Sequence, residues 1–322
     1  MDRQGSLTGP AERAVIGAVR GFVSAHLDGR SVCVALSGGA DSLALTAGAV
    51  RAGLDVHAVV VDHGLQVGSD VVAETAAATA RRLGATAEVR RVSVDGAGGL
   101  EAAARTARYS ALDAARGGRP VLLGHTLDDQ AETVLLGLGR GSGGRSLAGM
   151  RPWSVPWGRP LLGVRRSQTV AACEGWGLPV WDDPHNGDPR FTRVRVRTEV
   201  LPLLEDVLAS GVAEALARTA DQLTADSDAL DALAEDLLDR QVDECLAVSD
   251  VDDAPPAIRT RVVRFWLQLR GIEAPSHRIV TGVDALICDW RGQGPIAVGG
   301  DDEARLVVTR RAGMLVVERH TR

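Results

Sequence analysis

Lysine is absent from the 322-residue sequence, so all 36 strongly basic side chains are those of arginine. Aromatic residues are scarce, at 3%, and no apolar run approaches the roughly 20 residues that a membrane-spanning helix needs. Residues 1–10 lack the basic and apolar stretches of a signal peptide. These absences predict a soluble, cytoplasmic protein with no membrane partner.

The sequence holds only four cysteines, and they lie far apart in the chain. Because there is no C-x-x-C pair and no histidine at ligand spacing, neither a zinc site nor a disulfide framework is predicted. We interpret all four as small buried apolar residues. They are Cys33, Cys173, Cys245 and Cys288.

The net charge of −6 argues only weakly against a nucleic-acid partner, because the acidic residues are concentrated in one segment. Of the 42 acidic and 36 basic residues, twelve acids and one base lie between Asp221 and Asp253, which leaves 30 acids against 35 bases elsewhere. Binding to phosphates depends on nearby arginines and not on the overall charge. The composition is therefore compatible with a local cationic surface.

Short valine-rich segments alternate with longer alanine-rich segments in the first part of the chain. This alternation is typical of buried parallel strands connected by crossover helices. We predict a doubly wound α/β sheet whose ligand lies at the carboxyl ends of the strands. The predicted strands are 31–36, 55–62, 87–94 and 121–124, and the predicted helices are 43–52, 71–83 and 100–116.

The later part of the chain has a different pattern. Residues 137–149 are rich in Gly and Ser, which predicts a mobile loop, with a simple linker as the alternative. Leucines at 223, 230, 233 and 237 predict one long amphipathic helix. Helices at 258–269 and 277–288 and strands at 295–298, 305–309 and 314–318 then predict a small α+β domain. The expected organisation is a catalytic domain at 1–204, a helical connector at 205–248 and a C-terminal domain at 249–322.

The segment SGGADS, residues 37–42, follows a predicted strand and precedes a predicted helix. Glycines let successive N–H groups approach an anion, and the hydroxyls and the helix N-terminus add further attraction. We predict a pyrophosphate cradle for ATP here. An aspartate beside phosphate implies a bridging divalent cation, so Asp41 is the predicted Mg²⁺ ligand. The predicted ATP-binding residues of this loop are Ser37, Gly38, Gly39, Ala40, Asp41 and Ser42.

Six further motifs follow SGGADS along the chain. They are VDHGLQ (61–66), EAAARTARY (101–109), GHTLDDQAET (124–133), LGRGSG (138–143), RPLL (159–162) and DDPHNGDPRFTRVRVR (182–197). In this order, the set resembles the tRNA(Ile)-lysidine synthetase family of PP-loop ATP pyrophosphatases. The resemblance implies adenylation of C2 of the wobble cytidine in a CAU-anticodon isoleucine tRNA, followed by displacement of AMP by free L-lysine. It also implies ATP and Mg²⁺ as cofactors and tRNA recognition by the C-terminal domain.

The motif GHTLDDQAET contains the main candidates for catalysis. His125 lies at a strand end, and Asp129 and Glu132 are three residues apart, so they share one face of the following helix. Such carboxylates can hold a second Mg²⁺ or the lysine ammonium, and one with a raised pKa can accept a proton. A solvated first turn is the alternative. With the family resemblance we expect His125, Asp129 and Glu132 to be catalytic, together with Asp41.

Two other motifs contribute candidates near the nucleotide. In EAAARTARY, Glu101, Arg105 and Arg108 lie on one helix face, where they form either a surface ion pair or a charge that stabilises the phosphates. We take Arg105 as catalytic. Asp62 and His63 end the second strand and are expected to border the adenosine, although a histidine there can equally cap the strand.

An arginine-rich run near residue 190 is the candidate RNA contact. Arginine binds phosphate oxygens and stacks on bases, and the alternative is a solvated face paired with nearby aspartates. We predict that Arg197 reaches the active site. The predicted tRNA contacts are Arg140, Arg190, Arg193 and Arg195. A second patch is expected from the C-terminal arginines 259, 261, 264 and 270.

Three alternatives differ in class. A PP-loop tRNA thiolase requires cysteines for sulfur, commonly as C-x-x-C, and this pair is missing. A non-catalytic ATP-binding module would not need Asp129 and Glu132. A small-molecule ligase would not need an arginine run and an appended domain. The sequence leaves the assembly open, a homodimer included.

Overall fold

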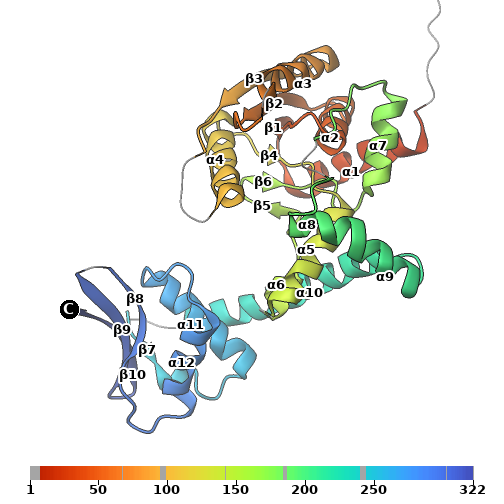
Figure 1. The fold of residues 1–322 in the computed structure, drawn as a ribbon. Coiled ribbons are helices and arrows are strands. Elements are labelled where there is room, and N and C mark those ends of the chain that lie inside the picture. Colours follow the sequence, from red (N-terminus) through yellow and green to blue (C-terminus); the bar gives the residue numbers. More distant parts are fainter. Residues whose placement is uncertain are drawn as a thin grey trace, which may run out of the picture. The chain divides into compact units, whose positions relative to one another are not determined.

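The computed structural model describes residues 8–66, 68–94, 99–141, 143–183, 187–239, 244–301 and 303–321, without the side chains of Leu100 and Glu101. Glu101, which we placed on a helix face with Arg105, is therefore not described beyond its backbone. The chain forms two compact units, Met1–Asp221 and Gln222–Arg322 (Figure 1).

A six-stranded sheet forms the centre of the first unit, in the order β3-β2-β1-β4-β6-β5. All neighbouring strands are parallel except β5 and β6, which form an antiparallel pair at one edge. The predicted doubly wound α/β fold is confirmed, and the edge pair was missed because its strands are only two residues long. The strands are β1 (Ser31–Ala35), β2 (Asp55–Asp62), β3 (Thr86–Arg91), β4 (Val121–Leu122), β5 (Trp153–Ser154) and β6 (Trp157–Gly158).

Helices cover both faces of this sheet, because alternate strand residues point to opposite sides. Val32 and Val34 pack with the helices of one face, α1 (Pro10–His26), α2 (Ala40–Arg51), α3 (Ser69–Leu83) and α7 (Arg166–Gly175). Cys33 packs on the other face with Leu112 of α4 (Leu100–Ala115). The crossover helices α2, α3 and α4 were expected from the sequence, whereas α1 was not.

The segment expected to be a mobile loop is largely helical. Helix α5 (Leu127–Arg140) extends into it, and α6 (Gly144–Leu147) follows; residue 142 lies outside the described part. Gly137 permits this packing, since a Cβ atom there would lie 2.0 Å from the carbonyl oxygen of Ser146. The side chain of Gln130 closes the segment by donating to the Met150 carbonyl and accepting from the Met150 amide, at 3.0 and 2.7 Å. Gly137 and Gly149 thus serve close packing here, whereas a Cβ atom at Gly139, Gly141, Gly143 or Gly144 would meet nothing within 4 Å.

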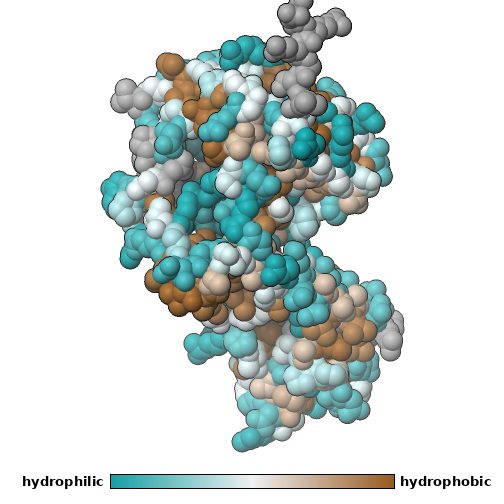
Figure 2. All heavy atoms as spheres, turned by 90° about the vertical axis from the view of Figure 1, so that its right-hand side faces the viewer, coloured by the Kyte–Doolittle hydropathy of each residue, from teal (hydrophilic) through white to brown (hydrophobic). Residues whose placement is uncertain are grey.

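The first unit continues through α8 (Thr192–Arg195), a π-helical turn η2 (Val196–Val200) and α9 (Leu201–Val207). Exposed apolar side chains lie along η2 and α9, namely Val200, Leu203, Val207 and Leu208. Figure 2 shows hydrophobic residues gathered in separate patches between hydrophilic ones. Within the described residues, no helix is long and apolar enough to span a membrane.

The long predicted helix is present as α10 (Val212–Leu238), which contributes residues to both units. Its buried side in the second unit is formed by Ser227 and Ala234, whereas Leu233, which we placed on the apolar stripe, is 52% exposed. The stripe therefore follows positions 223, 227, 230, 234 and 237, at true helical spacing.

The second unit packs α11 (Pro256–Leu269) and α12 (His277–Cys288) against an antiparallel sheet in the order β7-β10-β9-β8. The strands are β7 (Leu246–Ala247), β8 (Ile296–Gly300), β9 (Ala304–Arg311) and β10 (Met314–Thr321), and a short turn, η3 (Val248–Asp250), follows β7. Trp266 and Leu267 of α11 are buried in the core with Leu286 and Leu315. The small α+β domain was predicted, apart from β7. Cys288 is exposed, so the expectation that every cysteine is buried was wrong.

Candidate active site

The SGGADS segment forms the turn between β1 and α2, and α2 begins at Ala40 with Gly39 as its N-cap. The hydroxyl of Ser42 accepts from the Ser37 amide at 3.1 Å and donates to the Gly39 carbonyl at 3.0 Å. The two serine hydroxyls lie 3.1 Å apart. The loop is therefore held by its own hydroxyls, and it presents the positive end of α2 to an anion.

Two glycines are required by the backbone around this loop. Gly38 has φ +91°, which disfavours any side chain, and its carbonyl accepts from the Trp181 amide at 3.0 Å. Gly124, directly after β4, lies against the first turn of α2, because a Cβ atom there would be 3.1 Å from the backbone of Asp41. Gly124 thus allows the end of β4, with His125, to lie beside the loop.

A cavity of about 580 Å³ opens at the carboxyl ends of β1 and β4, where the sequence placed the ligand. The predicted residues that line it are Ser37, Gly39, Ala40, Asp41, Ser42, Arg105, His125, Asp129 and Arg197. Arg108, which was named with Arg105 as a candidate near the phosphates, also lines it, as do residues that were not predicted, among them Tyr109, Arg166, Trp181 and Asp182. Gly38 lies behind the lining, against Trp181.

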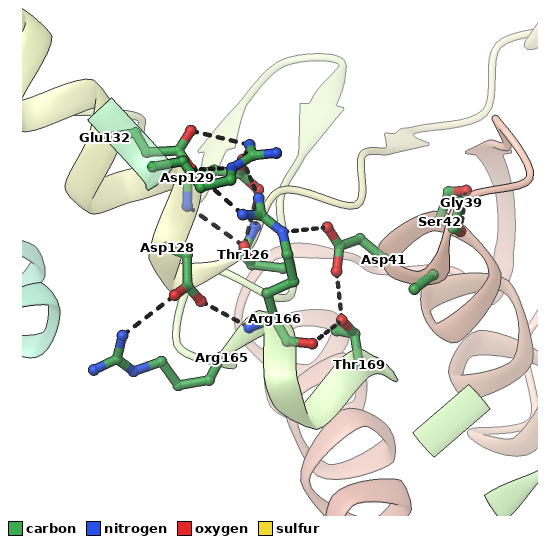
Figure 3. Close-up of polar contacts among 12 residues, drawn as sticks. Gly39, Asp41, Ser42, Thr126, Asp128, Asp129, Glu132, Arg165, Arg166 and Thr169 are labelled. Atoms are coloured by element: carbon green, nitrogen blue, oxygen red, sulfur yellow. Dashed lines mark hydrogen bonds and ion pairs between the residues drawn. The ribbon is translucent and has the colours of Figure 1, made fainter. Parts of the chain in front are cut away.

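Three carboxylates and three arginines form a cluster, the carboxylate–arginine cluster, which contributes four residues to the cavity lining. Its carboxylates are Asp41, Asp129 and Glu132, and its arginines are Arg166, Arg193 and Arg197. Figure 3 shows Arg166 with the three carboxylates. Arg166 donates from Nε to Asp41 at 3.2 Å, from Nη2 to Asp129 at 2.6 Å and from Nη1 to Glu132 at 3.3 Å.

Glu132 is fully buried and is the acid with the most arginine partners in this cluster. Arg197 lies 2.7 Å from it and Arg193 3.4 Å, in addition to Arg166. Asp129 pairs with Arg197 at 3.5 Å. The prediction that Asp129 and Glu132 share one helix face is confirmed, because the same arginines contact both.

Asp129 and Asp41 have opposite ionisation tendencies. Burial favours a raised pKa for Asp129, but Arg166 and the hydrogen bonds from Thr126 outweigh it and lower the pKa. Burial raises the pKa of Asp41 despite its bonds from Thr169 and Arg166, and the nearby Asp129 charge adds to the rise. Asp129 is therefore ionised at neutral pH and a poor proton acceptor, which leaves the binding of an ammonium group or a metal ion as its predicted role.

Thr126 explains how Asp129 is held. It is the N-cap of α5, and the Asp129 carboxylate accepts from its amide at 2.8 Å and from its hydroxyl at 2.9 Å, which forms a capping box. Asp129 and Glu132 are buried, so the solvated first turn that we gave as the alternative is not present, and the capping box coexists with the contact of Asp129 to Arg166.

Another part of the cavity wall contains Arg105 and His125. Arg105 donates to the hydroxyl of Tyr109 at 3.3 Å and lies over its ring at 4.9 Å. Burial lowers the pKa of His125 to about 4, although Asp129 opposes the shift, so its imidazole is neutral near pH 7. Within the described residues, Nδ1 of His125 is buried and has no hydrogen-bond partner. This wall offers positive charge and an unused polar atom to a ligand.

Asp62 and His63 lie at the end of β2 and outside the cavity lining. Asp62 is buried, accepts from the Gly64 amide at 3.0 Å and lies 3.8 Å from Arg91. Burial and the charge of Arg108 lower the pKa of His63. In the structure Asp62 orders the following turn, and His63 lies close to the charged wall of the site.

The arginine run separates into two groups. Arg193 and Arg197, four residues apart, face the carboxylate–arginine cluster. Arg195 faces outward and pairs with Glu199 at 2.8 Å, and Arg190 pairs with Asp188 at 2.6 Å. The expected pairing of the run with nearby aspartates is therefore present for Arg190.

Arg166 and Thr169 are the functional candidates that sequence reasoning missed. Both lie in the first turn of α7, and the Thr169 hydroxyl donates to Asp41. Their only sequence signal was position, shortly after the RPLL motif and at the start of a helix. Nothing in the local sequence shows that α7 lies beside α2 and α5.

The expected arginine patch of the second unit is largely structural. Arg259 is buried and bonded to Asp284 at 2.6 Å, Arg261 pairs with Asp231 at 2.7 Å, and Arg264 donates to the Pro275 carbonyl at 2.8 Å. Arg270 lies 3.5 Å from Glu244. Arg259 is therefore a structural residue and not part of an RNA-facing patch, whereas an RNA contact of Arg261, Arg264 and Arg270, which are only partly buried, stays a prediction.

Two other arginines of this unit border a groove. Arg278 of α12 and Arg305 of β9 are exposed and line a depression of about 560 Å³ with Ile279 and Pro295. Neither arginine makes an ion pair with any residue in the described part of the chain.

Comparisons with known proteins agree with this geometry. A family model described as a PP-loop domain matches residues 15–204, and one described as the TilS substrate binding domain matches residues 246–316. A protein from Nocardia farcinica named tRNA(Ile)-lysidine synthase is 59% identical over 310 residues, which cover 95% of this chain and 98% of that protein. One of the same name from Mycobacterium bovis is 55% identical over 330 residues and covers 99% of both chains.

Among solved structures, a U34-tRNA thiolase from Methanococcus maripaludis has a TM-score of 0.52 and 16% identity, covering 66% of this chain and 78% of that one. This likeness concerns the fold alone. None of the four cysteines of this chain lines the cavity, and burial raises the pKa of the Cys173 thiol, beneath the loop, to about 12. The site therefore lacks an available thiolate.

Proposed function

Because the chain belongs to the tRNA(Ile)-lysidine synthase family and is a ligase that forms a C–N bond, we propose that its cavity carries out both steps of lysidine synthesis. In the first step the C2 oxygen of the wobble cytidine attacks the α-phosphorus of ATP and pyrophosphate leaves. In the second step an amino group of free lysine attacks C2, AMP leaves with that oxygen, and the amine loses a proton.

The observation that carries this proposal is the division of the cavity into a phosphate side and an ammonium side. The loop of Ser37–Ser42 and the arginine wall with Arg105 provide donors and positive charge for a polyphosphate. Asp129, which lines the cavity, and Glu132, which is fully buried and not part of the lining, provide carboxylates for an ammonium group. A cavity with both sides suits a reaction that joins an activated nucleotide to an amino acid.

Asp41 is the residue that we propose to hold Mg²⁺. Its carboxylate lines the cavity beside the loop, and Mg²⁺ is commonly held by one or two carboxylates and by substrate phosphates. Among the described residues there is no group of three or more potential ligands, which fits an ion whose remaining ligands come from phosphate and water. When bound, the ion neutralises charge on the phosphates.

Roles for the remaining site residues follow from their positions. We propose that Ser37, Gly38, Gly39, Ala40 and Ser42 bind the phosphates, and that Asp62 and His63 border the nucleoside. Arg105 stabilises charge on the α-phosphate. His125, as a neutral imidazole, hydrogen-bonds a reacting group, and Arg197 orients Glu132 from its distance of 2.7 Å.

For tRNA recognition we propose both units. The exposed arginines 140, 190 and 195, with Arg193 at the edge of the site, contact RNA near the cavity. The unit that matches the TilS substrate binding domain provides the groove of Arg278 and Arg305. The proposed organisation is a catalytic domain at 1–204, a connector at 205–248 and a tRNA-recognition domain at 249–322, in a protein that works in the cytoplasm.

A chase experiment tests the two-step reaction. The protein is incubated with CAU-anticodon tRNA(Ile) and ATP labelled at the α-phosphate, first without lysine and then with it. We expect label to accumulate on the tRNA and to be released as AMP when lysine is added. Asp41→Ala should not label the tRNA, and Asp113→Ala, at an exposed position of α4, should label it normally. Label that never joins the tRNA would contradict an adenylated intermediate.

A further inference from the structure

Arg166 occupies the place in the cavity wall where a substrate cation would meet the carboxylates. Its three donor nitrogens contact Asp41, Asp129 and Glu132 at 2.6–3.3 Å. Within the described part of the chain, no other residue contacts all three. Figure 3 shows its guanidinium between Asp41 of α2 and the acids of α5.

In the absence of ATP and Mg²⁺, the carboxylate–arginine cluster has no net formal charge that would attract another cation. Three carboxylates face three arginines, so the cluster is neutral as it stands. Arg193 and Arg197 keep Glu132 paired from another direction, and Thr126 keeps Asp129 bonded. If Arg166 alone leaves, the cluster gains one net negative charge, which matches one ammonium group.

Arg166 can change partners without any change in the fold. Its backbone amide donates to Asp128 at 2.7 Å, and its neighbour Arg165 is fixed to Glu214 at 2.5 Å. The backbone of Arg166 is thus held, while its side chain is 24% exposed and lines the same cavity as Ser37 and Ser42. A polyphosphate bound at the loop provides negative charge within the cavity to which the guanidinium can turn.

We propose that Arg166 is a positioning residue that blocks the amine subsite until nucleotide is bound: its guanidinium pairs with the three carboxylates in the free protein and moves to the phosphates when ATP binds. Lysine then enters the subsite that Arg166 has left. This inference rests on the proposed lysine subsite at Asp129 and Glu132. It sets an order of binding, with ATP before lysine, and it protects the carboxylates from other amines in the absence of nucleotide.

The test is lysine binding by calorimetry, with and without α,β-methylene-ATP and Mg²⁺. For the unmodified protein we expect the analogue to tighten lysine binding by about 10-fold or more, and lysine to tighten analogue binding by the same factor. In Arg166→Gln, lysine should bind about equally with and without the analogue, because the internal cation is gone. Arg166→Lys keeps a cation at this position, so its affinity for lysine should still depend in part on the bound analogue.

Arg165→Gln is the matched control, because this neighbouring arginine points away from the cavity to Asp128 and Glu214. It should behave like the unmodified protein. Equal lysine affinity of the unmodified protein with and without the analogue would overturn the role of Arg166, as would an unchanged dependence in Arg166→Gln. If the unmodified protein binds the analogue but never lysine, the lysine subsite itself is wrong, and the inference fails with it.

Discussion

At the scale of single residues, the site depends on ion pairs between carboxylates and arginines that are partly or fully buried. Glu132 is fully buried and has three arginine partners, whereas Glu199 has one partner, Arg195, at the surface. A buried charge whose partner is removed costs far more than an exposed one. The two glutamates therefore form a matched pair for mutation.

Glu132→Gln keeps the size of the side chain and removes its charge, which leaves three arginines without a full counter-charge. We expect the free energy of unfolding to fall by about 1–3 kcal/mol and lysine transfer to fall by at least about 100-fold. Urea unfolding and a transfer assay measure the two effects. Glu199→Gln should leave the unfolding free energy nearly unchanged, because its ion pair with Arg195 is exposed to solvent. Equal changes in unfolding free energy and lysine transfer for the two variants would contradict the role of the cluster in stability and catalysis.

His125 predicts a pH dependence of stability. Its pKa is lowered from 6.5 to about 4 by burial, so between these values the unfolded chain binds a proton that the folded chain does not. The stability associated with a neutral His125 is therefore complete above pH 6.5 and is lost as the pH falls toward 4. As the pH is lowered, we expect the free energy of unfolding of His125→Gln to fall by about 1–2 kcal/mol less than that of the unmodified protein.

Urea unfolding between pH 7.5 and pH 4.5 measures that dependence. His277→Gln, at an exposed position of α12, is the control and should leave the curve unchanged. If His125→Gln has the same pH dependence as the unmodified protein, His125 is not kept neutral by the fold.

At the scale of elements, the sequence predicted what depends on local pattern. The bounds of β2, residues 55–62, were predicted because a valine-rich run has polar residues on both sides, and α12, residues 277–288, because its apolar periodicity has clear ends. The loop at 37–42 was found because glycines between a strand and a helix have a specific physical use. These features need no information about distant residues.

What the sequence did not show depends on tertiary contacts. Arg166 differs from the other 35 arginines only because α7 lies beside α2 and α5. The division of the run at 190–197 depends on which helix face is turned inward, and Arg259 became a core ion pair because Asp284 of another helix is opposite. Gly137 is required because the carbonyl of Ser146, nine residues later, leaves no space for a side chain. The glycine content of the segment does not indicate this contact.

Thr126, the N-cap of α5, should affect the KM for lysine in addition to the free energy of unfolding. Thr126→Ala removes the hydroxyl that bonds Asp129, and we expect a loss of about 1 kcal/mol in unfolding free energy. Ser276 caps α12 in the same way by accepting from the Ile279 amide, so Ser276→Ala should cost about as much stability. Only Thr126→Ala should raise the KM for lysine. A rise of equal size in both would mean that the KM reports general destabilisation.

At the scale of the whole molecule, the two units have separate tasks in our account. The first unit holds the chemistry, and the second provides a groove with two arginines that have no ion-pair partner among the described residues. A net charge of −6 is compatible with RNA binding because these cations are local. Charge at the groove should therefore control tRNA affinity without changing the cavity.

The double variant Arg278→Glu/Arg305→Glu should weaken tRNA binding by about 10-fold or more and reduce its salt dependence, because phosphate contacts are lost. Affinity for the ATP analogue should stay the same. Filter binding over a range of salt concentrations measures the affinity for tRNA and its salt dependence. Arg291→Glu/Arg311→Glu, two arginines paired with Asp289 and Glu318, is the control and should have a smaller effect. Unchanged tRNA affinity in the groove variant would remove the groove from the account.

The central claim is that one cavity joins lysine to an ATP-activated cytidine in tRNA(Ile). The most direct measurement is incorporation of radiolabelled lysine into CAU-anticodon tRNA(Ile) with ATP and Mg²⁺, beside initiator tRNA and Asp41→Ala. We predict label in tRNA(Ile) alone, lost in Asp41→Ala. Hydrolysis of ATP to AMP and pyrophosphate with no lysine in either tRNA would contradict the claim.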